Sequence, residues 1–232
     1  MTRATAGKDL RVLWTSPIPY VVAALFQAVV AVLYVSQLED RRQALMQPFF
    51  PIAGFMLVVL VPVLAMRTLA EEARAGTLDL LLAVPVATRP LVAGKWLATW
   101  ATSLAVLAPA ALFAPILRWF GHPDSGPIVT GFAGLVLLTA ALTGIGVLAS
   151  SLTASQPVAA MVALFVSLAL WFAHRGTASA GVAGVLARFS TSDRLRSFAG
   201  GAVHTADVGF FVAVAAGALV LAAAAVDSRR LR

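Results

Sequence analysis

The sequence predicts an all-α integral membrane protein with six transmembrane helices. Of its 232 residues, 60% are hydrophobic and 12% are charged, against about 45–50% and about 25% in soluble domains. Too few polar side chains remain to cover a water-facing surface, so lipid must solvate much of the chain. In lipid only helices or closed barrels satisfy the backbone, and the apolar stretches here are continuous rather than alternating, which favours helices.

Six apolar segments are long enough to cross a bilayer, for which about 17–25 residues are needed. The third contains Pro109 and Pro115 and is expected to bend there or to run past the membrane. The fifth is short and begins at Pro157, a favourable first-turn residue. We therefore expect one transmembrane domain over residues 1–232, with spans at about 18–36, 48–66, 91–117, 128–150, 157–173 and 207–226.

The basic residues suggest how the chain is oriented. Six spans place both termini on one side, and ten of the 17 Lys and Arg residues fall on that side, including those of residues 228–232. The positive-inside rule then places both termini in the cytoplasm. Because the basic residues flank the apolar runs, the net charge of +7 is not attributed to nucleic-acid binding. The absence of Cys excludes disulfides and thiolate metal sites.

Two segments outside the spans are expected to form short helices. Residues 8–17 mix apolar side chains with Lys8 and Arg11 and include Trp14, as in an N-terminal helix lying in the membrane interface. Residues 174–206 are rich in Gly and Ser, and we expect short extracytoplasmic re-entrant or interfacial helices there. One apolar face within them would be formed by Val182, Val185, Leu186 and Phe189.

Residues 67–90, between the second and third spans, form a charged insert. Arg67 and Glu71 are four residues apart, and Glu71 and Arg74 are three apart, so these side chains can pair along a helix that leaves the second span. Gly76 is a natural stop for that helix, because glycine readily adopts the left-handed conformation of a helix end.

A second, short apolar helix is predicted directly after this stop. Thr77 can cap it, Asp79 lies in its first turn, and Pro85 ends it. Its leucines are too apolar for a solvated loop, so they need either a groove on a partner or a place under the bundle, and the residues alone leave both open. Glu71 and Glu72 beside them are expected at a water-exposed helix end, which docking on a soluble partner would explain. The leucines are Leu78, Leu80, Leu81 and Leu82.

This insert resembles the ABC-2-type exporter permeases, in particular their gliding-motility-type subgroup. The residues that carry the resemblance are Glu71, Glu72, Arg74, Gly76, Thr77, Asp79, Leu80, Leu81, Leu82, Pro85, Gly94 and Lys95. Further similarity in residues 16–22, 148–156 and 197–201 and at Asp207 extends it over nearly the whole chain. Ala154 and Ser155 depart from the acidic or amide pair expected before Gln156.

The resemblance implies the membrane subunit of an ATP-driven ABC exporter in a bacterial or archaeal cytoplasmic membrane. Two ABC ATPase subunits would bind two permease chains, as a homodimer or with a sister permease. ATP and Mg would be held by the ATPase, and no cofactor, metal or catalytic residue is expected on this chain. The implied coupling residues are Glu71, Glu72, Arg74, Gly76, Thr77, Asp79, Leu80, Leu81 and Leu82.

Other polar residues have simpler explanations. Gly94-Lys95 lacks the Gly and the Ser or Thr of a phosphate-binding loop, because Arg89 and Trp96 occupy those positions. We therefore expect Lys95 to be an anchor at the membrane interface. No metal-binding motif contains the three histidines, which are His122, His174 and His204.

Two residues at or inside the spans are candidates for a transport pathway. Gln27 could line such a path or hydrogen-bond a neighbouring helix, and we favour helix packing. Asp207 could be a proton or ion site, but its position after Thr205 favours a helix cap. Close helix contacts, within one chain or between two, are expected at the small residues Ala140, Gly144, Gly146 and Ser150.

The residues disfavour two of three alternative functions. An ion-coupled secondary transporter usually has internal repeats and midplane charges, and neither is evident here. An intramembrane enzyme needs a nucleophile with a base, or a metal cluster, inside the spans, and the sequence shows none. A non-transporting membrane assembly protein stays open on the sequence alone.

Overall fold

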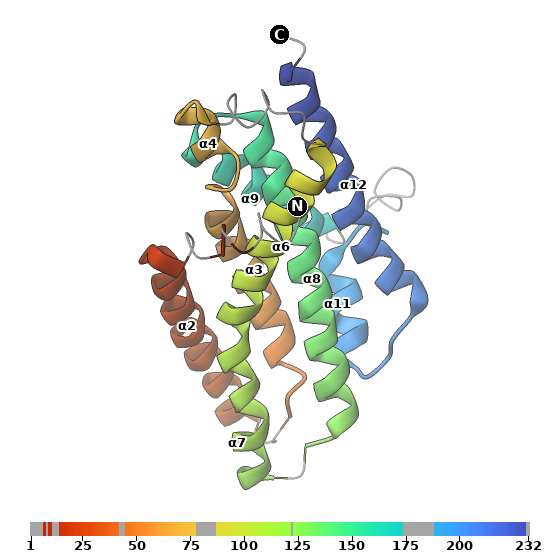
Figure 1. Ribbon diagram of the computed structural model, residues 1–232. Coiled ribbons are helices and arrows are strands. Elements are labelled where there is room, and N and C mark those ends of the chain that lie inside the picture. Colours follow the sequence, from red (N-terminus) through yellow and green to blue (C-terminus); the bar gives the residue numbers. More distant parts are fainter. Residues whose placement is uncertain are drawn as a thin grey trace.

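The computed structural model describes residues 7, 9–10, 14–41, 45–77, 87–121, 123–173 and 188–230, and all regular structure in these ranges is helical (Figure 1). This confirms the predicted all-α class. In chain order the elements are α2 (Ile18–Arg41), α3 (Phe49–Ala65), α4 (Ala70–Arg74), α6 (Thr88–Leu107), the 3-10 helix η1 (Ala108–Leu112), α7 (Phe113–Phe120), α8 (Ser125–Leu152), α9 (Gln156–Phe172), α11 (Thr191–Ala199) and α12 (Thr205–Arg230).

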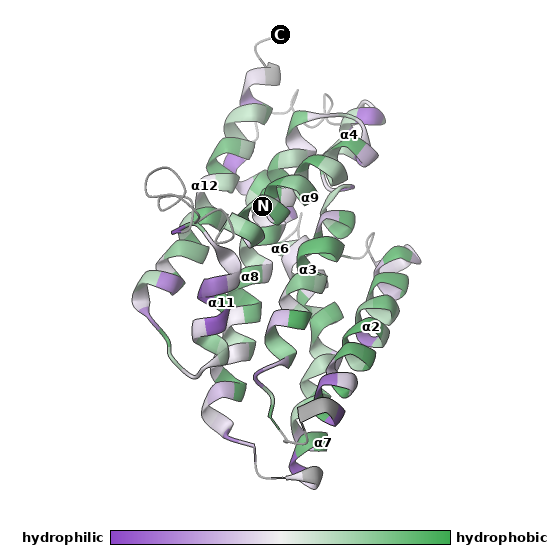
Figure 2. Ribbon diagram, turned by 180° about the vertical axis from the view of Figure 1, so that it is seen from behind, coloured by the Kyte–Doolittle hydropathy of each residue, from purple (hydrophilic) through white to green (hydrophobic). Residues whose placement is uncertain are grey.

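The long helices run side by side, with α4 and the C-terminal end of α12 at one end of the bundle and α7 at the other (Figure 1). Within the described residues, five helices are long and apolar enough to cross a membrane. The sixth apolar helix, α9, has 17 residues. At 1.5 Å per residue it covers about 26 Å, slightly less than the roughly 30 Å of a hydrocarbon core. Figure 2 shows hydrophobic residues over the long helices and hydrophilic ones on α4 and α11.

The third apolar segment is interrupted where the sequence predicts. The α-helix α6 ends at Leu107, the chain continues as η1 with Pro109, and α7 follows. Pro109 has no N–H to donate to the carbonyl four residues earlier, so the α-helical pattern fails there. Pro115 lies in the first turn of α7, where its missing N–H removes no helical hydrogen bond, and it does not end that helix.

Helix α8 is central because its small residues let other helices approach closely. It packs against α3, α6, α9, α11 and α12. A Cβ atom on Gly146 would collide with the Cβ of Ala65 on α3, and one on Gly144 would lie 3.2 Å from the Cα of Ala215 on α12. The predicted close contacts at these two glycines therefore occur within one chain.

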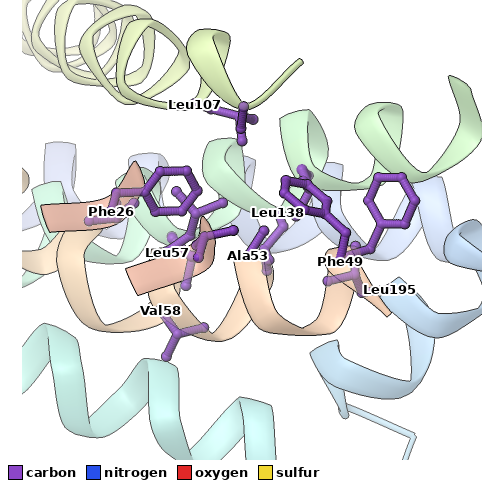
Figure 3. Packing of buried hydrophobic residues seen from close by; sticks show 14 of the residues in the cluster. Phe26, Phe49, Ala53, Leu57, Val58, Leu107, Leu138 and Leu195 are labelled. Atoms are coloured by element: carbon purple, nitrogen blue, oxygen red, sulfur yellow. The ribbon is translucent and has the colours of Figure 1, made fainter. Parts of the chain in front are cut away.

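The hydrophobic core lies along α3, between α2, α6, α8 and α11 (Figure 3). Phe26 of α2, Leu57 of α3 and Leu138 of α8 are each at most 1% exposed. Leu107 and Leu195 bring α6 and α11 into the same cluster. This core holds the long helices together and leaves α4 beyond its end.

Candidate functional site

The break between α3 and α4 is set by one side chain of α8. The Ser150 hydroxyl accepts hydrogen bonds from the main-chain N–H groups of Leu69 (3.0 Å) and Ala70 (2.8 Å), and it donates to the carbonyl of Met66 (3.1 Å). A helix break leaves such main-chain groups without partners in the helix. Ser150 is 1% exposed, so it satisfies these groups where water cannot, and it determines where α4 begins.

An ion pair within the insert links Arg67, which precedes α4, to Glu71 in the first turn of α4. Arg67 Nε lies 3.0 Å from Glu71 Oε2, and a second guanidinium nitrogen donates to Oε1 at 3.2 Å. The predicted pairing of these two residues is therefore confirmed, with two parallel hydrogen bonds. The Arg67 guanidinium also donates to the Ser16 hydroxyl at 2.9 Å. The Glu71 side chain is 46% exposed, so this pair lies at the water-facing edge of the insert.

Lys95 of α6 is buried, and the prediction of a membrane-interface anchor is wrong. Its side chain is 4% exposed, and its ammonium group lies 2.7 Å from Glu72 Oε1 and 3.3 Å from Asp9 Oδ2. The same ammonium donates to the Thr68 carbonyl at 3.0 Å. A lysine has three N–H donors, and all three find acceptors here. The cluster of Asp9, Thr68, Glu72 and Lys95 is called the Lys95 cluster below.

Glu72 is also not the water-exposed group that the sequence suggested. Its side chain is 19% exposed, and Oε2 is buried with no hydrogen-bond partner among the described residues. Adjacent residues on a helix point about 100° apart, so Glu71 faces water while Glu72 turns inward to Lys95. A carboxylate can be buried in this way because a cation compensates its charge.

The far edge of α4 is exposed. Arg74, Gly76 and Thr77 are exposed to solvent, and Gly76 has φ +70°, the left-handed conformation that favours glycine. The predicted helix stop at Gly76 is thus confirmed. The Thr77 hydroxyl donates to the Glu72 carbonyl at 3.3 Å, in the last turn of α4. Asp79, Leu80, Leu81 and Leu82, with the helix predicted to contain them, lie outside the described residues.

Another ion pair joins α11 to α12. Arg194 donates to Asp207 Oδ1 at 2.6 Å and to the carbonyls of Ala206 and Arg188 at 3.3 and 2.7 Å. The guanidinium carbon lies 4.2 Å from the centre of the Phe210 ring. Asp207 was expected to cap α12, but it is the third residue of the helix and binds Arg194 instead. The local pattern around Asp207 carries no information on residue 194, so the sequence could not reveal this partner.

Gln27 connects α2 to α6. Its Nε2 atom donates to the Val106 carbonyl at 3.0 Å, just before the 3-10 segment η1. The favoured interpretation, a hydrogen bond between neighbouring helices, is confirmed.

Two residues of this site were not singled out from the sequence. Ser150 appeared only as one small residue among several, and Asp9 only as part of the interfacial segment. The position of Ser150 and Ser151 at the end of an apolar span was a signal, because a buried hydroxyl requires a partner. No local feature pointed from Asp9 to Lys95.

The described bundle of apolar helices defines a multi-pass membrane protein whose short charged insert lies at one end. Residues 15–198 match the family described as ABC-2 family transporter protein. This range covers most of the chain and includes the whole insert, so the chain belongs to the ABC-2 transporter family and is a transmembrane permease. The gliding-motility-type subgroup stays a prediction. No match to a curated protein was found.

Proposed function

We propose that this chain is the membrane-spanning subunit of an ATP-driven ABC exporter, and that α4 with residues 75–90 is the surface on which a separate ABC ATPase docks. The observation that carries the proposal is the two-sided environment of α4. Its inner side is bonded to α6 and α8 through Lys95 and Ser150, and its outer edge exposes Arg74 and Thr77 at the end of the bundle.

The residues that follow supply the other half of such a surface. Leu80, Leu81 and Leu82 form an apolar run directly after the exposed turn at Gly76. A short apolar helix next to exposed charges suits a groove on a soluble partner. In the proposed complex, two ATPase subunits bind ATP and Mg and two permease chains form the export pathway between them. Both termini lie in the cytoplasm in this proposal, which the excess of Lys and Arg on that side supports, and the family resemblance suggests a bacterial or archaeal membrane.

In the proposed complex this chain changes conformation, and the ATPase subunits carry out the ATP hydrolysis. ATP binding draws the two ATPase subunits together, each subunit displaces the α4 on which it is docked, and the two bundles respond by opening or closing the cavity between them. The energy comes from the partner, because this chain lacks the sequence of a phosphate-binding loop at Gly94-Lys95.

Affinity purification of the tagged chain from its native membrane tests the proposal. We expect an ABC ATPase to co-purify and its ATP hydrolysis to rise in the presence of the permease. Leu81→Ala should weaken docking by about 1–3 kcal/mol, as expected for an interface anchor. Arg74→Glu should also weaken docking, with a larger effect at low salt.

The matched control is Arg118→Glu, the same reversal at an exposed residue of α7, at the other end of the bundle. It should leave docking unchanged. A chain that purifies without any ATPase, or that transports on an ion gradient alone, would overturn the proposal and favour the secondary transporter or the assembly protein.

A further inference from the structure

We infer that Lys95 is a positioning residue that attaches α4 to α6, so that a displacement of α4 by the ATPase is transmitted to the third membrane segment. This inference rests on the proposed function of α4 as the docking element. It assigns to Lys95 a role in coupling that differs from that of Glu71 and Thr77, whose side chains hydrogen-bond within the insert.

Because α4 is short, its position depends on its bonds to the neighbouring helices. It has five residues, and isolated helices shorter than about 12–15 residues are marginal in water. Of its five residues only Ala70 is buried, and Ala73 is partly buried against a second, small apolar cluster, so the apolar area that α4 itself buries is small. Two polar attachments join α4 to the long helices: the hydrogen bond that the Ala70 N–H donates to Ser150 of α8, and the bond that Lys95 of α6 donates to Glu72.

These two attachments differ in what they join. Ser150 connects the start of α4 to α8 with neutral hydrogen bonds. Lys95 connects α4 to α6, and the same ammonium also binds the Thr68 carbonyl and Asp9 of the N-terminal segment. One buried cation therefore holds three separate parts of the chain, and charge-assisted hydrogen bonds are about twice as strong as neutral ones.

The charges of the Lys95 cluster predict which of its variants weakens the attachment of α4 most. Glu72→Gln removes one negative charge and leaves Lys95 paired with Asp9. Lys95→Met leaves two carboxylates close together without a cation, so they repel each other and separate α4 from the N-terminal segment. Glu71→Gln is a matched control, because Glu71 pairs with Arg67 of the same insert and not with α6.

Spin labels on two exposed residues test whether α4 and α6 move together. The chain has no native Cys, so labels at Ala75→Cys and Ala101→Cys report only the distance between α4 and α6. In the wild-type complex we expect this distance to stay the same when ATP, Mg and vanadate are added. In Lys95→Met, and to a lesser degree in Glu72→Gln, the distance distribution should broaden and shift with nucleotide. Glu71→Gln should resemble the wild type.

ATP hydrolysis by the same complexes gives the functional readout. Lys95→Met should still co-purify with the ATPase, but its stimulation of ATP hydrolysis should fall roughly tenfold, the scale of one lost charge-assisted hydrogen bond. Adding Glu72→Gln to Lys95→Met should cause no further loss, and Lys95→Arg should recover part of it. A residue needed only for folding would instead lower yield without separating docking from stimulation.

Unchanged distances and full stimulation in both Lys95→Met and Glu72→Gln would overturn the inference, as would losses that add in the double variant. If Lys95→Met does not fold, the comparison of Glu72→Gln with Glu71→Gln decides the question alone. Failure of the wild-type chain to bind an ATPase would overturn the proposed function instead, and the label distances in the free chain would still test the attachment of α4 to α6.

Discussion

Two of the short helices of this bundle, α4 and α11, are attached to the long helices in different ways. Both form an ion pair with a long helix, Glu72 with Lys95 at 2.7 Å and Asp207 with Arg194 at 2.6 Å. Helix α11 also buries Leu195 and Phe198 against α3 and α8, whereas α4 has a single buried residue. Removing the ion pair should therefore release α4 but only loosen α11.

The difference follows from where the two helices lie along α8. Thr130 of α8 donates to the Phe198 carbonyl of α11, and Ser150 binds the start of α4. Twenty residues separate these positions, about 30 Å of helix. The α11 half of α8 lies beside the aromatic core around α3, which offers apolar surface. The α4 end lies past that core, beside a smaller apolar cluster against which only Ala73 of α4 is partly buried. Polar bonds therefore contribute a larger share of its attachment, and an element attached in this way is suited to transmit a partner's movement.

The largest expected effect is the difference between removing the two cations. Lys95→Met should destabilise the chain by about 3–5 kcal/mol, because it leaves buried carboxylates without a counter-charge. Arg194→Met should cost less, about 1–3 kcal/mol, since the Arg194 side chain is 21% exposed against 4% for Lys95 and α11 keeps its apolar contacts. Thermal unfolding in detergent measures both. Equal losses would show that apolar packing does not secure α11.

The next-largest expected effect tests the apolar packing of α11 against α8. A Cβ on Gly134 of α8 would lie 2.8 Å from the Cβ of Phe198, so Gly134→Val should displace α11 and cost about 3 kcal/mol, near the upper end for overpacking. Gly209→Val on α12 is the control, because a Cβ there meets nothing within 4 Å, and it should change stability by less than about 0.5 kcal/mol. Thermal unfolding compares the two, and a tolerated Gly134→Val would mean that α11 is held by Arg194 alone.

A smaller effect is expected for the neutral attachment of α4. Ser150→Ala leaves the N–H groups of Leu69 and Ala70 without their acceptor, at a cost of about 2 kcal/mol. The control is Ser103→Ala, whose hydroxyl donates to the Thr99 carbonyl of its own helix. Hydrogen exchange at residues 69 and 70 should rise in Ser150→Ala and stay at the wild-type level in Ser103→Ala. Unchanged exchange in both would leave Lys95 as the decisive attachment of α4.

The smallest effect is expected for Gln27, which provides a neutral bond between two long helices. Gln27→Met removes its hydrogen bond to the Val106 carbonyl and should cost about 0.5–1 kcal/mol, as for similar bonds in membrane proteins. The shift in unfolding temperature should be smaller than that of Ser150→Ala. A larger shift would indicate that the 3-10 segment η1 depends on this bond.

The sequence predicted the helices well and their polar partners poorly. Apolar runs and the prolines sufficed for the six helices and for the interruption at Pro109, because both are local properties of the chain. The pair of Arg67 with Glu71 was also local, at a spacing of four residues. Lys95 and Asp207 were misjudged because their partners lie 23 and 13 residues away, and no periodicity within one helix encodes such a pairing.

The sequence by itself determined that this chain is a helical membrane protein, because continuous apolar segments have to satisfy their backbone hydrogen bonds internally in lipid. It also determined that the helix α4 ends before Gly76, since the left-handed turn there favours glycine. Only the tertiary structure decided which of the two adjacent glutamates faces Lys95 and which faces water. That choice depends on how α4 is rotated, which Ser150 of a distant helix sets by binding the first turn of α4.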